Sequence, residues 1–492
     1  MFSRSSTSTP AAGRSGDGVV ARLVETSRRV PGEAACLVLV FSAYCAYLLS
    51  FGSRRFYWDA AEYWRLGGQF DRTGHFSLYS YTNPYRGYAL PLAAHVLKVL
   101  AVGVGMSGVT AVELAGAALA AVLGVSLLPR VARALFSEAS VGWGRVLVLN
   151  ALVFAYWRGH FNYPLTDFPA LALACLGLLA LLRRSAFGYL AAGVCFGLAA
   201  NLRPAYVPAL AVAALVTGLR PLLGEWGRRA LAVVLVLLGA LIASLPQMAV
   251  NHHSAGTWKP TLRGAHDISL VQLSGGLVAQ RYETFVGPRR QYPRAKVFYV
   301  DPAGSRVLRE EAISGVSGYV QYLRIVVRHP LLMAGSYGLH LFDGLDVWYP
   351  TPYVTDLNGR SSVLSLLQYS LLFLALVRLV GRRARERLGR VWWAGIAVLL
   401  SPCVLPIVGA VEPRFFLPVY ALVYTLVCFG PELRASVVPR ESGRRVALAC
   451  AYGAFVLLCF AVSSATWRQS EHPVAAGRAK PTQLQAVTAP ER

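Results

Sequence analysis

Apolar runs long enough to cross a lipid bilayer recur along the whole chain, and they constrain its fold more than any other feature. The hydrocarbon core of a bilayer is about 30 Å thick, so a spanning helix needs about 20 predominantly apolar residues. Only 15% of the 492 residues are charged, whereas soluble domains carry roughly 25% charged residues. The sequence therefore predicts an all-α polytopic membrane protein with about 11 transmembrane helices, within a range of 10 to 13.

Eleven runs are the candidate transmembrane helices. Two further segments, residues 88–104 and 331–345, are apolar but interrupted by polar residues, and we expect them to lie half-inserted at the membrane surface. The eleven candidates are residues 34–51, 108–128, 146–157, 168–182, 186–201, 205–219, 230–250, 362–380, 391–411, 414–430 and 446–466.

The distribution of arginine predicts how the chain is oriented. With the N-terminus inside, the short inner connections contain 17 Arg and the short outer connections contain four. Cytoplasmic connections are enriched in Lys and Arg, so we expect a multi-pass protein of the cell membrane with a cytoplasmic N-terminus. Two large loops, residues 52–107 and 251–361, are then extracytoplasmic. Orientation signals explain the net charge of +24, so nucleic acid is not an expected partner.

The remaining features define the domain organisation. Residues 34–466 are expected to form one transmembrane domain, flanked by a disordered cytoplasmic segment, residues 1–33, and a disordered tail, residues 467–492. All eight Cys lie in apolar segments, which favours buried thiols over disulfides or metal ligands. The sequence has no HExxH, P-loop or GxSxG motif in a suitable context, which argues against zinc proteases, ATP-driven pumps and many hydrolases.

Polar residues gather at the predicted outer face. Charged groups at membrane depth are costly and usually mark functional sites. The sequence therefore predicts an active site at the outer boundary of the membrane, where several loops converge. The candidates are Asp59, Glu62, Asp71, Arg158, His160, Asp167, Arg203, Asp343, Asp346, Glu412 and Arg414.

The stretch RRFYWDAAEYWRLG, residues 54–67, directly follows the first apolar run and is rich in charged and aromatic residues. Asp59 and Glu62 are three positions apart, so a helix would put them on one face. The same spacing is that of a capping box at a helix start. Asp59 is therefore a helix cap, a catalytic carboxylate or both.

Other charged motifs also have two interpretations. Arg203 precedes a proline, which suits either a snorkelling Arg at the start of a span or an Arg that binds phosphate. Glu412 and Arg414 are either a local ion pair or a functional pair, and their isolation within residues 391–430 favours function. Asp167 precedes a Phe-Pro pair, and for Asp167 alone we favour a helix cap.

Together these motifs resemble one protein family. Four elements occur in order between residues 34 and 430: WDAAEYW, TDFPALALACLGLLALL, GLAANLRPAY and EPRFFLPVYAL. They resemble elements of GT-C glycosyltransferases, in the branch of protein O-mannosyltransferases and bacterial lipid-A and polysaccharide sugar transferases. The resemblance implies a GT-C-like fold and an inverting transfer of a sugar from a polyprenyl-phosphate donor to a hydroxyl of an extracytoplasmic glycan, lipid or protein.

The resemblance also implies roles for single residues. Asp59 would be the general base and Glu62 its support, although Ala60 stands where some relatives have a second acid. Arginines would hold the donor phosphate, because a guanidinium binds two oxygens at once. No metal or other cofactor is predicted, although Asp343 and Asp346 would suit a divalent ion. The phosphate candidates are Arg203, Arg414 and Arg158, and the other substrate-binding candidates are Tyr63, His160, Asp167 and Glu412.

Two other classes of protein stay open as alternatives. A secondary transporter or lipid flippase would be expected to carry charged residues inside its spans. A glycan ligase or polymerase would have large outer loops similar to those predicted here, but the early acidic motif would be unexpected in it. The polar residues gather at the predicted outer face, and this clustering favours an enzyme.

Overall fold

The structure is a computed structural model, and it describes residues 32–136, 141–219, 226–286, 295–380, 390–430 and 442–471. Most of the predicted disordered N-terminal segment and the tail from residue 472 onward lie outside the described residues. The central parts of three Arg-rich connections also lie outside them, namely residues 220–225, 381–389 and 431–441.

Helices form most of the described chain, as expected for an all-α membrane protein. Within the described residues, five helical stretches are long and apolar enough to cross a membrane, and each overlaps a predicted span. The other six predicted spans coincide with shorter helices, so the total of eleven spans stays a prediction. The five long stretches are Glu33–Phe51, Gly108–Leu135, Trp226–Ala255, Ser362–Leu379 and Arg445–Arg468.

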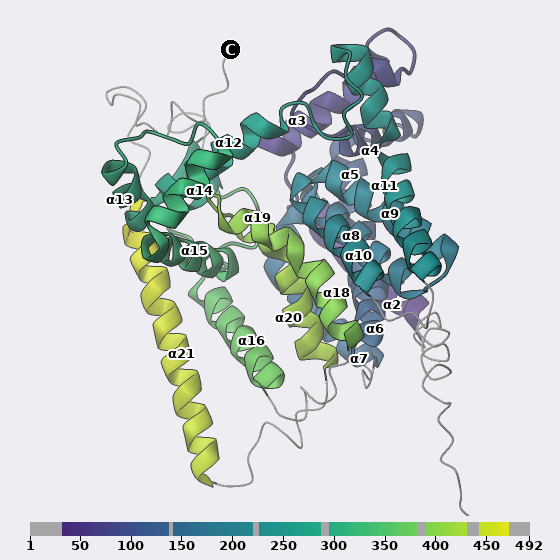
Figure 1. Ribbon diagram of the computed structural model, residues 1–492. Coiled ribbons are helices and arrows are strands. Elements are labelled where there is room, and N and C mark those ends of the chain that lie inside the picture. Colours follow the sequence, from purple (N-terminus) through teal and green to yellow (C-terminus); the bar gives the residue numbers. More distant parts are fainter. Residues whose placement is uncertain are drawn as a thin grey trace, which may run out of the picture.

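The larger part of the molecule is a bundle of helices that run in roughly the same direction in Figure 1. One of its elements, η3, is a single π-helical turn that links two α-helical halves of one span. The bundle consists of α2 (Glu33–Phe51), α5 (Gly108–Ala121), η3 (Val122–Leu127), α6 (Leu128–Leu135), α7 (Trp143–Trp157), α8 (Asp167–Leu182), α9 (Ala186–Leu202), α10 (Val207–Leu219), α11 (Trp226–Ala255), α16 (Ser362–Val380), α18 (Arg390–Leu400), η6 (Ser401–Cys403), α19 (Val404–Ile407), α20 (Leu417–Phe429) and α21 (Ser442–Arg468).

The smaller part, which we call the cap, lies across one end of the bundle (Figure 1). The two large predicted loops form it, and both lie at this same end. The predicted surface segments coincide with α4 and α15. The cap consists of α3 (Trp58–Gly67), η1 (Gly68–Asp71), η2 (Leu78–Ser80), α4 (Ala89–Gly103), α12 (Ala265–Val278), β1 (Ala279–Phe285), β2 (Ala295–Val300), α13 (Pro302–Glu310), α14 (Tyr319–Arg328), α15 (Pro330–Leu345) and β3 (Ser470–Glu471), and the turns η4 (Arg158–Asn162), η5 (Pro204–Tyr206) and η7 (Pro413–Phe416) join bundle helices.

The cap contains a small antiparallel sheet in the order β1-β2-β3, which the all-α prediction lacks. Strand β3 follows α21 directly and pairs with β2. Trp467, just before β3, packs its ring against Trp348 with centroids 5.6 Å apart. The predicted start of a disordered tail at residue 467 is therefore too early, since the folded chain continues to residue 471.

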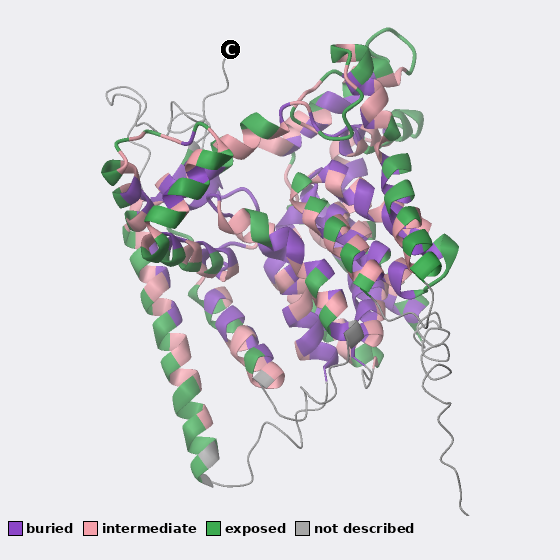
Figure 2. Ribbon diagram, viewed as in Figure 1, coloured by how far each residue is buried: buried purple, intermediate pink, exposed green. Residues whose placement is uncertain are grey.

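Close contacts between small residues hold parts of the bundle together. A Cβ on Gly193 of α9 would lie 2.0 Å from the carbonyl oxygen of Val236 on α11, and a Cβ on Gly239 would lie 2.1 Å from that of Leu190. Such small residues let membrane helices approach closely. Figure 2 shows α21, in contrast, exposed along much of its length, which suits contact between its apolar residues and lipid.

Candidate active site

Asp59 is the second residue of α3, in the cap. Its Oδ1 accepts a hydrogen bond from Nη2 of Arg86 at 2.6 Å, and its Oδ2 lies 3.5 Å from Nη2 of Arg414. The side chain is still 37% exposed, so an incoming molecule can reach the carboxylate. The preceding residue, Trp58, has a φ of 42°, which is uncommon for a bulky residue. Backbone strain of this kind is often found at functional sites.

The start of α3 does not use the predicted capping box. The N-cap residue is Tyr57, which makes no side-chain cap hydrogen bond. The hydroxyl of Tyr353 instead accepts a hydrogen bond from the backbone N–H of Ala60 at 3.1 Å, which satisfies one of the unpaired N–H groups of the first turn. The capping interpretation of Asp59 is therefore wrong, and its carboxylate contacts arginines instead.

Glu62 pairs with Arg65 on an exposed part of α3, with Oε1 and Nη2 2.7 Å apart. Exposed pairs of this kind contribute roughly 0–1 kcal/mol to the free energy of unfolding. We therefore expect Glu62→Gln to lower that free energy by less than about 1 kcal/mol and to leave turnover close to that of the wild type. Thermal unfolding and an activity assay measure both effects. A loss of turnover comparable to that of Asp59→Asn, at an unchanged melting temperature, would make Glu62 a catalytic residue.

Arg414 lies at the centre of the charged residues. Its Nε pairs with the carboxylate of Glu412, its Nη2 reaches Asp59, and its Nη1 lies 3.6 Å from Oδ2 of Asp167. Glu412 in turn accepts a hydrogen bond from Oγ1 of Thr284 at 3.0 Å. One buried guanidinium thus contacts carboxylates from three separate parts of the chain, which fixes its position.

Arg203 reaches the same place from the end of α9. It pairs with Asp167, the first residue of α8, and its guanidinium carbon lies 4.5 Å from the ring centroid of Phe415. The residue before α8, Thr166, makes no side-chain cap hydrogen bond. The carboxylate of Asp167 lies between Arg203 and Arg414 instead of capping its helix, so the capping interpretation is wrong here too.

These residues form a charged cluster in which the positive charges of the arginines equal the negative charges of the carboxylates. Burial raises the pKa of Asp59, but the charges of Arg86 and Arg414 outweigh it and hold this pKa well below its ordinary value. Asp59 is therefore ionised at neutral pH. The cluster consists of the carboxylates Asp59, Asp167 and Glu412 and the guanidinium groups of Arg86, Arg203 and Arg414.

Tyr63 and His160, two of the predicted substrate-binding residues, lie beside arginines of the charged cluster. The hydroxyl of Tyr63 accepts a hydrogen bond from Nη1 of Arg86 at 3.0 Å, and its ring lies below the guanidinium. His160 is buried beside Arg414. Burial, and then the charge of Arg414, lowers the pKa of His160 to about 3, so this imidazole is neutral at physiological pH.

Arg158 is the one predicted phosphate ligand that the structure does not bring to the charged cluster. Its Nη1 donates to the carbonyl oxygen of Ala155 at 2.6 Å, at the end of its own helix. Its guanidinium lies 5.9 Å from the ring centroid of Tyr47. These contacts match an arginine that binds the last carbonyls of a helix.

Three residues that surround Asp59 are not among the candidates predicted from the sequence. Arg86 and Tyr353 contact its segment directly, and Lys296 adds a positive charge nearby while its ammonium lies 4.7 Å from the ring centroid of Tyr282. These residues come from irregular or short elements of the cap, where no helical periodicity marks them. The turn sequence NPYRGY around Arg86 is the one local signal for any of them.

A second buried cluster lies beside the charged cluster. Both clusters line a cavity of about 20 Å³, to which the charged cluster contributes Glu412 and Arg414 and the second cluster contributes Arg281 and Glu283. This volume suits about one water molecule. Arg281 pairs with Glu283 at 2.6 Å and donates to the carbonyl oxygen of Asp346 at 2.7 Å. The cap is thus held together by polar contacts immediately next to the candidate site.

Asp343 also belongs to this second cluster, because Nη1 of Arg281 donates to its backbone carbonyl oxygen at 3.2 Å. Its Oδ1 accepts a hydrogen bond from Oγ1 of Thr466 at 3.0 Å, and its Oδ2 has no hydrogen-bond partner among the described residues. Burial raises the pKa of Asp343 to about 8, although the charge of Arg281 acts in the opposite direction. The folded protein therefore holds this carboxyl protonated at neutral pH.

The raised pKa of Asp343 predicts a pH-dependent stability. Between pH about 4 and pH about 8 the folded state binds a proton that the unfolded chain releases, so the free energy of unfolding falls as the pH rises through this window. Asn cannot ionise, and we expect Asp343→Asn to raise the melting temperature at pH 8 by roughly 2 °C or more with a smaller effect at pH 5. Melting curves at both pH values measure this. Equal shifts at both would contradict a protonated Asp343.

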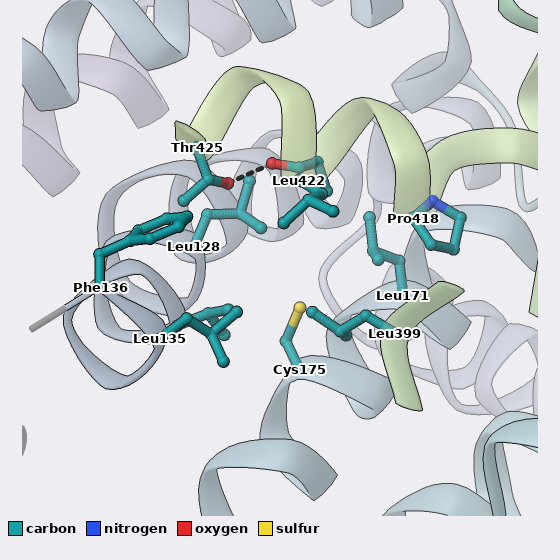
Figure 3. A pocket seen from close by; sticks show the side chains of 11 residues that line it. Leu128, Leu135, Phe136, Leu171, Cys175, Leu399, Pro418, Leu422 and Thr425 are labelled. Carbon is teal, nitrogen blue, oxygen red and sulfur yellow. Dashed lines mark hydrogen bonds between the residues drawn. The ribbon is translucent and has the colours of Figure 1, made fainter. Parts of the chain in front are cut away.

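A separate apolar cavity lies within the bundle between α6, α8, α18 and α20 (Figure 3). Its volume of about 10 Å³ is at the lower limit for a water molecule. The only hydroxyl that lines it, that of Thr425, donates to the carbonyl oxygen of Ala421 on its own helix. This cavity is a gap in side-chain packing.

Neither a metal centre nor a known relative identifies the site. Within the described residues, no group of three or more His, Cys, Asp and Glu side chains could hold a metal ion. No protein-family model matches the sequence, and comparisons with curated proteins and with solved structures find no significant match. The chemistry of the site therefore has to be inferred from its own residues.

Proposed function

We propose that this protein is a GT-C-like membrane glycosyltransferase. It transfers a sugar from a polyprenyl-phosphate donor to a hydroxyl of a glycan, lipid or protein of the cell envelope, on the extracytoplasmic side of the membrane. The observation that carries this proposal is the partly exposed carboxylate of Asp59 beside the guanidinium groups of Arg86 and Arg414, with Arg203 paired to Asp167 next to Arg414. A reaction that needs both a base and an anion-binding site for its leaving group matches this pair of features.

The transfer would proceed in one displacement. The acceptor hydroxyl gives its proton to the carboxylate of Asp59 while its oxygen forms a bond to the anomeric carbon. The bond from that carbon to the phosphate oxygen breaks, and its electron pair leaves with the polyprenyl phosphate. The leaving phosphate gains a negative charge, which guanidinium groups in a partly dry site stabilise. Attack from the opposite face inverts the anomeric configuration.

Donor binding also explains why a carboxylate of low pKa can act as the base. In the structure the arginines are neutralised by Asp59, Asp167 and Glu412. A donor phosphate would compete with these carboxylates for the guanidinium hydrogens. Arg86 and Arg414 would then stabilise ionised Asp59 less strongly, and the pKa of Asp59 would rise toward the range of an effective base.

A reconstituted assay tests the proposal. Full-length protein in liposomes is mixed with radiolabelled polyprenyl-phosphate sugars and a cell-envelope extract as the source of acceptors. We expect transfer of label from at least one donor, and slow release of free sugar when the extract is omitted. Absence of both reactions with every polyprenyl-phosphate sugar tested would reject the proposed function.

A further inference from the structure

Exposed aromatic side chains gather at one corner of the cap, next to the candidate site. Tyr79 and Tyr85 come from the loop between α3 and α4, and His252, His253 and Trp258 come from the end of α11 and the loop that follows it. All five are exposed, and Trp258 is 59% exposed. We call these five residues the aromatic corner. Side chains of this size are usually buried at least in part, so their exposure together requires an explanation.

The rings of the aromatic corner are ordered in pairs. The ring of Trp258 stacks on that of His252 with centroids 4.3 Å apart and planes at 16°, and Tyr79 lies 4.8 Å from His253. The ring of Tyr85 lies directly on the backbone of Gly264, where an added Cβ would come within 2.2 Å of it. The rings are therefore held in place before any ligand binds, which reduces the entropy cost of binding.

The corner stands beyond the apolar part of its helix. Helix α11 has 30 residues and is about 45 Å long, whereas the hydrocarbon core is about 30 Å thick. The helix starts with Trp226 and two arginines, which are typical of a membrane boundary. Its last residues, with His252 and His253, therefore extend out of the hydrocarbon. Figures 1 and 2 show this end, at the upper right, as an exposed part far from the opposite end of the bundle.

Two rigid connections join the corner to the charged cluster. Buried amides form a chain: Asn201 donates to Gln247 at 3.1 Å, Gln247 donates to Asn251 at 3.1 Å, and Asn251 donates to the carbonyl oxygens of Lys259 and Thr261. Asn201 is two residues before Arg203. The chain therefore fixes the loop after α11 relative to the arginine end of α9.

The second connection is the turn that carries Arg86. The side chain of Asn83 accepts hydrogen bonds from the backbone N–H groups of Tyr85 and Arg86, each at 2.9 Å. Tyr85 belongs to the aromatic corner, and Arg86 holds Asp59. Adjacent residues of one turn thus link the exposed rings to the proposed base, so a molecule lying on the corner is close to the site.

We infer that the aromatic corner binds the saccharide part of the acceptor and guides its hydroxyl to Asp59. Sugar rings present flat patches of C–H groups that fit the faces of aromatic rings, while imidazole and phenol groups exchange hydrogen bonds with their hydroxyls. The alternative is that these aromatic side chains contact lipid at the membrane boundary. Lipid contact would not need the adjacent imidazoles, the exposed Lys259 or the polar sequence NHHSAGTWKP. This inference rests on the proposed function and narrows its acceptor to a glycan or glycolipid.

Binding of oligosaccharides in the absence of donor tests this inference. The probe is an array of neutral linear hexose and pentose oligosaccharides, applied to the full-length protein in nanodiscs, followed by titration of the strongest ligand. We expect Tyr79→Ala and Trp258→Ala each to weaken binding about threefold to tenfold. Tyr319→Ala is the matched control for Tyr79→Ala, because Tyr319 is another exposed tyrosine of the cap, 47% exposed against 51% for Tyr79. It should bind like the wild type.

Other outcomes separate this inference from the proposed function. If the proposed function fails, the wild-type protein shows no transfer from any polyprenyl-phosphate sugar but still binds oligosaccharides, so the two failures are distinguishable. Absence of binding by any oligosaccharide would overturn the role of the corner. Unchanged binding in the Tyr79→Ala/Trp258→Ala double variant would also overturn this role. A melting temperature of this variant that is lowered only in nanodiscs would overturn it too, because it would mean that the corner contacts lipid.

Discussion

Asp59→Asn is expected to reduce sugar transfer by roughly 10²–10⁴-fold, the usual contribution of a general base. Asn has nearly the same shape as Asp, and its amide oxygen can still accept the hydrogen bond that Arg86 donates to Asp59, but it cannot take the proton of the acceptor. The side chain is partly exposed, so loss of its ion pairs should lower the free energy of unfolding by only about 1 kcal/mol. The donor phosphate should bind as well or better, because one competing charge is removed.

The measurement compares initial rates of transfer and melting temperatures for the wild type, Asp59→Asn and Glu62→Gln in the same liposomes. Glu62 is a suitable control because it belongs to the same helix but pairs with Arg65. Near-normal transfer by Asp59→Asn would reject this residue as the base. A comparable loss in both variants, together with lower melting temperatures, would point to a disturbed α3 instead of lost chemistry.

Several residues of the charged cluster could be predicted because each lies at the boundary of an apolar run. Asp167, Arg203 and Arg414 mark the starts or ends of spans in the sequence, and Asp59 follows the first span closely. Orientation by the positive-inside rule then puts these ends on one side. The structure brings their side chains into contact. The rule is not selective, however, since Arg158 has the same kind of position and binds carbonyls of its own helix instead.

The rest of the site depends on tertiary contacts that leave no local pattern. Arg86 reaches Asp59 across 27 positions of the chain, and its turn fits closely against α9, where a Cβ on Gly87 would lie 2.0 Å from the carbonyl oxygen of Asn201. Strand β1 also has no clear signal in the sequence, because its buried residues include Arg281 and Glu283. Alternating apolar residues usually reveal a strand, and here an ion pair replaces them.

Arg414→Leu is expected to be the most damaging single change to the fold. It leaves the buried carboxylate of Glu412 without its guanidinium partner and removes a positive charge from beside Asp59 and Asp167. Removing one partner of a buried ion pair typically costs about 3–5 kcal/mol of stability. Transfer should fall as well, since the leaving phosphate loses a donor. A low melting temperature alone would therefore not distinguish the two roles of Arg414.

A second substitution separates stability from catalysis. In Glu412→Gln/Arg414→Leu the uncompensated charge is gone, and the Gln oxygen can still accept the hydrogen bond that Thr284 now donates to Glu412. Because removing both charges of a buried pair is often nearly neutral, we expect the double variant to regain most of the lost melting temperature. Transfer should stay low, since Arg414 is still absent. Recovery of transfer together with stability would mean that Arg414 only holds the fold, and that phosphate binding belongs to Arg86 and Arg203 alone.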